Sequence, residues 1–204
     1  MTLYIIRHGE TEYNRLGIVQ GSGVDTDLND TGYEQARAFY ETYQEAGFEL
    51  VVTSRLRRTH QTVRHFIGQN IPWIQTEDIN EISWGEHEGM PGTPERIQVY
   101  RRTIEQWNAG NLEASLPGGE SARALQDRVG RFVEWVRKRP EKRILVGTHG
   151  RTLRCLVTIL KGLDAAAMEG VQHSNTGLFI VHFQGDEVVF EVENNTAHLT
   201  RITA

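Results

Sequence analysis

Apolar positions along the chain fall into two alternating kinds of segment. Short apolar runs lie at residues 3–6, 50–53 and 143–148, and runs of this length are typical of buried strands. Between them, apolar side chains recur every three or four residues, which is the spacing of one face of a helix. Strands that alternate with helices in this way predict an α/β fold with a mostly parallel sheet flanked by helices.

Several longer segments carry the helical spacing, and residues 121–139 show it most clearly. An apolar stripe that we interpret as a core face runs along this segment: Leu125, Val129, Phe132, Val133 and Val136. The predicted helices cover residues 31–46, 55–69, 94–108, 121–139 and 150–161. The end of the chain differs, because residues 177–183 and 188–192 flank a Gly-Asp turn and predict a hairpin.

Length and composition predict one domain. A chain of 204 residues is only modestly longer than a common single domain and can bury a sizeable core. Residues 85–119 are rich in Gly and Pro and contain one of the predicted helices. We expect this segment to be a cap-like insertion over the active site, within a single domain that spans residues 1–204.

Composition and charge exclude several classes of function for this chain. Hydrophobic residues make up 38% and charged residues 24% of the chain, as in an ordinary globular protein. The net charge of -5 and the lack of a Lys/Arg-rich block argue against binding to nucleic acid. No apolar stretch is long enough to span a membrane, and Arg7 interrupts the first apolar run too early for a signal peptide. We expect a cytoplasmic protein, for which a homodimer stays one option.

The single cysteine, Cys155, excludes an internal disulfide. It lies between Leu153 and Leu156 in a predicted helix. A thiol at such a position packs like a small apolar side chain, so we interpret Cys155 as part of the core and not as a reactive group.

Two of the apolar runs end at a histidine that is followed by a glycine. Residues 3–6 lead into Arg7 and His8, and residues 143–148 lead into His149. Because ligands bind at the carboxyl edge of an open parallel sheet, we expect both histidines to lie at that edge. Packing alone does not easily explain two such strand ends. A cation beside an imidazole suits an anionic substrate that is attacked by a nitrogen nucleophile.

A third strand end adds another cation. Residues 50–53 read as a strand, Ser54 as a helix N-cap and Arg55 as the first helical residue. The amino end of a helix presents unpaired N–H groups and a partial positive charge, so Arg55 would stand at an anion site. Arg58 lies on the same helix. We interpret two further arginines of this helix as a solvated basic face: Arg57 and Arg64.

Short motifs run from one end of the chain to the other, among them RHGETEYN at residues 7–14, EISWGEHEG at 81–89 and PGGES at 117–121. Others lie at residues 20–21, 28–36, 53–55, 148–150 and 194–199. In order and spacing these motifs resemble the histidine phosphatase superfamily, the group of cofactor-dependent phosphoglycerate mutases and many small phosphatases. The resemblance implies a phosphoglycerate mutase-like three-layer sandwich.

The resemblance also implies roles for individual residues. His8 would be the nucleophile that becomes phosphohistidine, and Glu81 would protonate the leaving oxygen. Three side chains would hold the phosphoryl oxygens: Arg7, Arg55 and His149. Three more match positions that usually touch the phosphate or the rest of the substrate: Asn14, Gln20 and Gly21. Fixed cations suit this chemistry, because a phosphoryl group in transfer spreads negative charge over its oxygens.

The acid is the least certain of these roles from chemistry alone, because three glutamates crowd one loop. Glu81, Glu86 and Glu88 could each supply a proton, and the motif selects Glu81. In the same loop, Trp84 and His87 could line the substrate pocket. For Trp84, structural packing is an equally good interpretation.

Metal-assisted hydrolysis is the main rival chemistry, and the sequence disfavours it. The chain has eight histidines but no His-Glu-x-x-His pattern and no closely spaced Cys/His pair. The arginines expected beside His8 would repel a metal cation. We therefore expect a reaction without metal or other cofactor.

Three functions remain to be compared. A phosphatase that hydrolyses small phosphomonoesters is preferred over a mutase, because the segment after Glu81 is acidic and lacks the Arg/Lys-rich element of the mutases. A non-catalytic phosphate-binding or adaptor protein ranks last, since the core motifs are complete. The expected partner is a small phosphorylated substrate, with sugar phosphates, phosphoglycerates, α-ribazole phosphate and phosphoprotein side chains as candidates.

Overall fold

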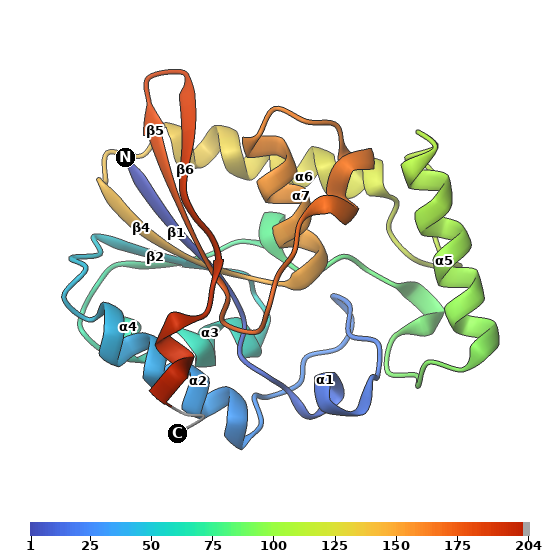
Figure 1. Cartoon of the computed structure of the whole chain (residues 1–204), viewed down its shortest axis with the longest axis horizontal. Helices are drawn as coiled ribbons and strands as arrows, with labels where there is room; N and C mark the ends of the chain where they lie inside the picture. Colours follow the sequence, from blue (N-terminus) through green and yellow to red (C-terminus); the bar gives the residue numbers. More distant parts are fainter. Residues whose placement is uncertain (202–204) are drawn as a thin grey trace.

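The computed structural model describes residues 1–201, and it is built around one six-stranded sheet with the strand order β3-β2-β4-β1-β5-β6 (Figure 1). The strands are β1 (Thr2–Arg7), β2 (Leu50–Thr53), β3 (Trp73–Gln75), β4 (Arg143–Thr148), β5 (Leu178–Gln184) and β6 (Glu187–Asn195). The first four are parallel, and β5 runs antiparallel to both β1 and β6. The predicted α/β fold with a mostly parallel sheet, including the terminal hairpin, is confirmed.

Helices cover both faces of this sheet. They are α1 (Glu12–Leu16), α2 (Asp30–Tyr43), α3 (Arg57–Thr62), α4 (Arg64–Ile67), α5 (Pro94–Asn108), α6 (Ala122–Arg137) and α7 (Gly150–Leu160). Short 3₁₀ turns follow as η1 (Glu77–Ile79), η2 (Gly85–His87), η3 (Ala165–Gly170) and η4 (Ala197–Arg201). The predicted helix at residues 94–108 coincides with α5, and those at 121–139 and 150–161 end within two residues of α6 and α7.

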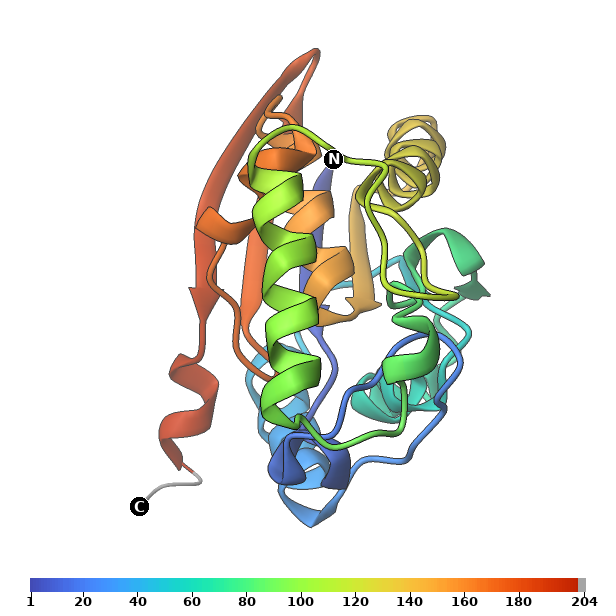
Figure 2. The same cartoon turned by 90° about the vertical axis from the view of Figure 1, so that its right-hand side faces the viewer.

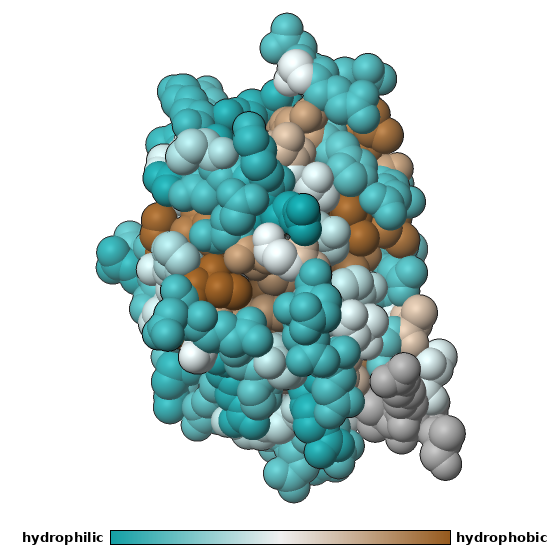
Figure 3. Space-filling model, turned by 90° about the vertical axis from the view of Figure 1, so that its left-hand side faces the viewer, coloured by the Kyte–Doolittle hydropathy of each residue, from teal (hydrophilic) through white to brown (hydrophobic). Residues whose placement is uncertain are grey.

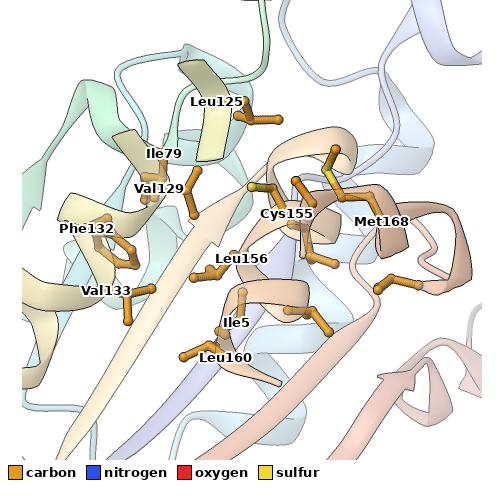
Figure 4. Packing of buried hydrophobic residues seen from close by; sticks show 14 of the residues in the cluster. Ile5, Ile79, Leu125, Val129, Phe132, Val133, Cys155, Leu156, Leu160 and Met168 are labelled. Carbon is orange, nitrogen blue, oxygen red and sulfur yellow. The ribbon is translucent and has the colours of Figure 1, made fainter. Parts of the chain in front are cut away.

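Strand alternation explains why helices pack on both faces. Successive side chains of a strand point to opposite sides of the sheet. In β1, Leu3 and Ile5 belong to one buried cluster and Ile6 to a second. Helices α6 and α7 pack on the first cluster, where the predicted stripe of α6 lies against apolar side chains of α7 (Figure 4). Each fully buried side chain of this size stabilises the fold by roughly 1.5–3 kcal/mol.

The cysteine lies in this core. Cys155 is fully buried on α7 next to the apolar side chains of the first cluster (Figure 4). Burial raises the pKa of its thiol to about 12. The interpretation of Cys155 as an inert core residue is confirmed.

The segment at residues 85–119 packs on the main body through its apolar side chains. Helix α5 forms one side of the molecule (Figure 2), with Thr93 as N-cap and Pro94 in its first turn. Trp107 of α5 and Leu116 after it belong to the first buried cluster. This segment therefore shares its core with the sheet.

The predicted helix at residues 55–69 is wrong in its start and its continuity. Leu56 is the N-cap residue, so α3 begins at Arg57, and Ser54 instead accepts a hydrogen bond from the N–H of Leu56 over 3.1 Å. Val63, with φ -107° and ψ 14°, separates α3 from α4. The shift of the helix start decides which arginine faces the sheet edge.

The face of the molecule opposite α5 is covered mainly by hydrophilic residues, with separate apolar patches near its middle (Figure 3). Within residues 1–201, no helix has the length and apolar character that crossing a bilayer requires. The apolar side chains are used to build the two clusters around the sheet.

Candidate active site

The carboxyl edge of the sheet carries two histidines side by side. Strands β1 and β4 are parallel neighbours in which Arg7 pairs with Thr148, so the next residue of each strand is a histidine. The ring centroids of His8 and His149 are 5.2 Å apart, and the two residues are 3% and 0% exposed. Two adjoining strands thus deliver both imidazoles into one buried site.

His8 is held in a single tautomer. Its Nδ1 lies 2.7 Å from the carbonyl oxygen of Gly9. A carbonyl oxygen only accepts, so Nδ1 carries the proton and Nε2 keeps its lone pair. Burial, then the guanidiniums of Arg58 and Arg7, hold the pKa of His8 well below its usual range. His8 is therefore neutral at neutral pH, with Nε2 able to act as a nucleophile.

The turn after β1 is packed too closely to accept a side chain at Gly9. A Cβ there would lie 2.7 Å from the carbonyl oxygen of Gly32. The Gly9 N–H donates to Oγ1 of Thr62 over 2.9 Å, and the side-chain amide of Asn175 donates to the carbonyl of His8 over 3.0 Å. These contacts fix the backbone that carries the nucleophile.

His149 is neutral as well, and both of its ring nitrogens have partners. Nε of Arg58 donates to its Nδ1 over 3.1 Å, which leaves the proton on Nε2. Nε2 lies 2.8 Å from Oγ of Ser54, to which it therefore donates. Burial is the main reason that the pKa of His149 lies well below its usual range, and Arg58 is the next. A phosphoryl oxygen would have to replace Ser54 as the acceptor of this proton.

Arg7 is a half-buried cation with unused donor capacity. Its Nη1 lies 3.3 Å from Nδ1 of His173, which must accept because a guanidinium only donates. Burial, then Arg7, lowers the pKa of His173 to about 3, so this partner is uncharged. Nε of Arg7 is buried and finds no hydrogen-bond partner among residues 1–201. A buried donor without an acceptor is costly, and an oxygen of a bound phosphate would satisfy it.

The second arginine of the site is Arg58, and not Arg55 as expected. Arg58 is 0% exposed, and besides His149 it donates to the carbonyl oxygens of Val24, over 2.7 Å, and Gly21, over 3.2 Å. Burial lowers the pKa of its guanidinium to about 10, so it stays charged at neutral pH. This cation lies directly beside the imidazole pair.

Arg55 lies outside the site. Its side chain is 60% exposed and forms an ion pair with Glu77 at 2.5 Å. The physical reason is the late start of α3: Arg55 precedes the helix, and its N–H donates to the side chain of Asn80 over 2.9 Å. Arg58, three residues later, stands on the helical turn that faces the histidines. The expectation for Arg55 is therefore corrected to Arg58.

Glu81 lies at the amino end of α7, close to Arg7. It is 7% exposed, and its carboxylate accepts hydrogen bonds from the N–H groups of Ile82, Arg151 and Thr152 over 3.0–3.1 Å. The N–H groups at the start of this helix therefore fix the position of the Glu81 carboxyl group. Glu81 and Arg7 line the same pocket.

The two other glutamates of the loop are placed differently. Glu86 is exposed. Glu88 accepts hydrogen bonds from the N–H of Trp84 over 2.8 Å and from the N–H of Gly23 over 2.7 Å, so it joins two loops. Of the three candidates, Glu81 is the one that lines a pocket with Arg7.

The three remaining predicted residues lie around the histidines at different depths. The Asn14 side chain accepts hydrogen bonds from the Thr11 N–H over 3.2 Å and from Asn175 over 3.3 Å. Gln20 donates to Oγ1 of Thr11 over 2.7 Å, and Gly21 supplies a carbonyl to Arg58. Asn14 is thus linked to the His8 carbonyl through the side chain of Asn175, whereas the Gly21 carbonyl helps to position the Arg58 guanidinium.

Two polar residues near the nucleophile were missed by the sequence analysis: His173 and Asn175. They belong to the loop that precedes β5. Because β5 is antiparallel to β1, its start lies at the edge where β1 ends. The polar residues directly before the predicted hairpin were the available signal in the sequence. Only the pairing of β5 with β1 shows that they lie next to His8.

Trp84 and His87 both line a cavity. A pocket of about 190 Å³ is bordered by Arg7 and Glu81, and Trp84 and Tyr100 form another part of its wall. Trp84 also stacks on Trp107, with ring centroids 6.0 Å apart. The packing of Trp84 is therefore confirmed, whereas its contact with substrate stays a prediction. His87 borders a second, larger cavity that Trp84 and Tyr100 also line.

Two further cations border the small pocket, and one carboxylate pairs with both. Arg151 and Arg154 form ion pairs with Glu169, the latter at 2.7 Å. The Arg151 guanidinium also donates to the hydroxyl of Tyr100 over 2.6 Å. In the part of the chain that the structure describes, no group of three or more His, Cys, Asp or Glu side chains is arranged to hold a metal ion.

The chain is similar to known proteins over nearly its whole length. Residues 3–196 match the family described as "Histidine phosphatase superfamily (branch 1)". A protein named "Putative phosphoserine phosphatase 2", from Hydrogenobacter thermophilus, is 27% identical in an alignment of 204 residues that covers 98% of each chain. A "Probable phosphoglycerate mutase GpmB" from Escherichia coli is 30% identical in an alignment of 190 residues that covers 90% of this chain and 86% of the other.

The fold is similar to solved structures as well. The crystal structure of a putative α-ribazole-5'-P phosphatase from Escherichia coli K-12 superimposes with a TM-score of 0.86. It is 27% identical in sequence, and the match covers 97% of each chain. The sheet, its flanking helices and the edge that bears the histidines thus belong to one known architecture.

Proposed function

Because the chain belongs to branch 1 of the histidine phosphatase superfamily, we propose that it is a metal-independent phosphatase that hydrolyses small phosphomonoesters through a phosphohistidine at His8. One observation carries the proposal. Neutral His8, whose Nδ1–H is bound to a carbonyl and whose Nε2 keeps its lone pair, lies beside two guanidiniums, those of half-buried Arg7 and buried Arg58. This arrangement suits a nitrogen nucleophile that attacks an anion.

In the first step, Nε2 of His8 forms a bond to phosphorus while the bond between phosphorus and the alcohol oxygen breaks. Arg7 and Arg58 stabilise the negative charge on the three remaining phosphoryl oxygens, and the Nε2–H of His149 donates to one of them. Glu81, in its protonated form, gives its proton to the departing alcohol oxygen. The products are the alcohol and phosphohistidine.

In the second step, a water oxygen attacks the phosphorus of phosphohistidine. Glu81 is now ionised and accepts a proton from this water, so the group that served as acid becomes the base. The bond between nitrogen and phosphorus breaks, inorganic phosphate leaves, and His8 returns to its neutral form. No metal or redox partner enters this balance.

The proposal is tested with a panel of phosphomonoesters, assayed for released phosphate with and without a chelator. We expect hydrolysis to continue in the chelator and to be inhibited by vanadate, an oxyanion that would occupy the same cationic site. Loss of all activity in the chelator, restored by zinc or magnesium, would contradict it.

A mutase is the less favoured alternative, although one of the relatives carries that name. A phosphoglycerate needs a cation for its carboxylate in addition to those for its phosphate. The two additional arginines of the small pocket, Arg151 and Arg154, already share Glu169 as a partner. Incubation with 3-phosphoglycerate separates the alternatives, since a phosphatase releases phosphate and a mutase forms 2-phosphoglycerate.

We also propose that the protein acts in the cytoplasm on small phosphorylated compounds and has no nucleic-acid partner. The net charge of -5 supports the second part, because nucleic acids repel such a surface. The homodimer remains a prediction, which is tested by measuring the molar mass of the protein in solution by light scattering.

A further inference from the structure

A cavity of about 630 Å³ adjoins the small pocket of the active site. The two spaces have two wall residues in common, Trp84 and Tyr100, and the small pocket also holds Arg7 and Glu81. A group attached to a phosphate near Arg7 therefore passes these two rings when it extends into the cavity. In this position the cavity can receive the alcohol part of a phosphomonoester.

The lining of this cavity is mainly apolar, unlike that of the small pocket. Leu16 of α1, Ile97 of α5 and Leu116 contribute to it. Leu16 and Ile97 are 52% and 40% exposed, which leaves large apolar side chains in contact with water. Helix α1 and the lower end of α5 lie on the same side of the molecule (Figure 1, Figure 2), and each contributes a side chain to the cavity wall. Apolar surface of this kind gains free energy when an apolar ligand covers it.

The aromatic wall between the two spaces is held rigidly. Trp84 is 7% exposed, stacks on buried Trp107, and contacts Tyr100 edge-to-face with ring centroids 5.2 Å apart. Arg151 donates to the Tyr100 hydroxyl over 2.6 Å from a side chain that is itself 6% exposed. The wall is thus formed before any ligand binds, which reduces the entropy that binding costs.

We propose that the substrates of this enzyme are phosphate monoesters of apolar alcohols, whose hydrocarbon body occupies the cavity between α1 and α5. The inference rests on the proposed function and adds the substrate class to it. A small polar alcohol such as serine would leave most of the 630 Å³ unfilled. Known ligand cavities of roughly 300–1,000 Å³ enclose molecules of drug size, so an apolar body of that size fits.

A series of straight-chain alkyl phosphates tests the inference. Ethyl, butyl, hexyl and octyl phosphate leave as alcohols of nearly equal acidity, so the chemical step is the same and differences report binding of the chain. We expect kcat/KM to rise about fourfold for each methylene that enters the cavity, given the usual gain of about 0.8 kcal/mol from burying such a group. A kcat/KM that is constant or falls with chain length would overturn the inference.

A matched pair of variants links the effect to the cavity. Ile97 and Val99 lie on the same helix and are both 40% exposed, but only Ile97 lines the cavity. Ile97→Glu should reduce the ratio of octyl to ethyl phosphate kcat/KM at least about fivefold, because it places a charge where the chain would lie. Val99→Glu should keep the ratio of the parent protein. Equal ratios in the two variants would contradict the placement of the chain.

The two proposals fail in different ways. If alkyl phosphates are hydrolysed without any dependence on length, the phosphatase proposal stands and the substrate class is wrong. If no phosphomonoester is hydrolysed, the phosphatase proposal is wrong, and calorimetry with ethyl and octyl phosphonate still decides whether the cavity binds an apolar chain. Tighter binding of octyl phosphonate, lost in Ile97→Glu, supports the inference, and equal affinities overturn it.

Discussion

The phosphate end of the site and the cavity beside it are built on different principles. At the phosphate end, His8, His149 and Arg58 are at most 3% exposed and joined to one another or to the surrounding backbone by hydrogen bonds. At the cavity, Leu16 and Ile97 are 52% and 40% exposed. Transition-state charge requires groups that are fixed beforehand, because reorganising dipoles during the reaction costs free energy. An apolar alcohol needs only surface, so this end can vary without disturbing the chemistry.

The largest expected effect comes from removing the nucleophile. His8→Ala should lower kcat by about 10⁶-fold, the scale known for loss of a nucleophile from a catalytic group that acts as a unit. Phosphate release from any ester in the panel measures it. The fold should persist, because alanine keeps the backbone hydrogen bond from the N–H of residue 8 to the carbonyl of Thr148. Appreciable remaining activity in a folded variant would remove the covalent mechanism.

The next largest effect is the loss of rate in Glu81→Gln, and its size should depend on the leaving group of the ester. This dependence separates the role of Glu81 in proton transfer from the binding of the alcohol. Glu81→Gln keeps the size of the side chain and one of its two acceptor oxygens but cannot protonate an alkoxide, so alkyl esters should slow by about 10²–10⁴-fold. Nitrophenyl phosphate releases a stabilised anion and should slow far less. Initial rates on both esters give the comparison. Equal losses would remove Glu81 from the role of acid and direct attention to the other loop glutamates.

A pair of arginine variants tests whether Arg58, and not Arg55, binds the phosphoryl group. Arg58→Met keeps most of the side-chain volume, removes the buried charge and should cost about 10²–10³-fold in kcat, as does the loss of one contact to transition-state charge. Arg55→Met is the control, and it should retain parental rates because its guanidinium is exposed and paired with Glu77. Thermal melting confirms that both variants fold. A larger loss in Arg55→Met than in Arg58→Met would reverse the assignment.

The smallest expected effect is a decrease in the free energy of unfolding at acidic pH. Burial lowers the pKa of His198 to about 4, and burial with Arg7 lowers that of His173 to about 3. An unfolded histidine titrates near 6.5, so below about pH 6.5 the unfolded state binds more protons than the folded one. The free energy of unfolding should thus be constant above this pH and fall as the pH drops toward 3 or 4.

Urea unfolding at neutral and mildly acidic pH measures this response. His198→Gln removes one of the titrating groups away from the catalytic histidines and should make the decline shallower. His8 and His149 are held neutral by the same burial, so kcat/KM should persist below the pH at which a free histidine becomes charged. A urea midpoint that does not move with pH would contradict the buried, uncharged histidines.

Sequence pattern alone was enough to place the two histidines. The apolar runs at residues 3–6 and 143–148 reflect local burial on both faces of a sheet, and a strand end is a local event. Parallel strands bring their carboxyl ends to one edge, so His8 and His149 follow from pattern plus one topological rule. The family motifs then selected Glu81 among the three loop glutamates.

The choice between Arg55 and Arg58 was beyond the reach of local pattern. Both follow the same strand, and the difference is whether the helix begins at residue 55 or 57. That boundary depends on contacts between distant parts of the chain, such as the hydrogen bond from the Arg55 N–H to Asn80. Two residues of shift change which side of the helix a side chain occupies, because each residue turns the helix by about 100°.

His173, Asn175 and the cavity between α1 and α5 depend even more fully on the folded chain. The loop that carries the first two reaches the nucleophile because β5 pairs antiparallel with β1, more than 160 residues away in sequence. Leu16 and Ile97 are ordinary apolar positions on two short amphipathic segments, and nothing in their spacing says that they border one space. Periodicity records which side of an element is apolar, whereas a cavity is a relation between elements, and only the packing of the whole chain creates it.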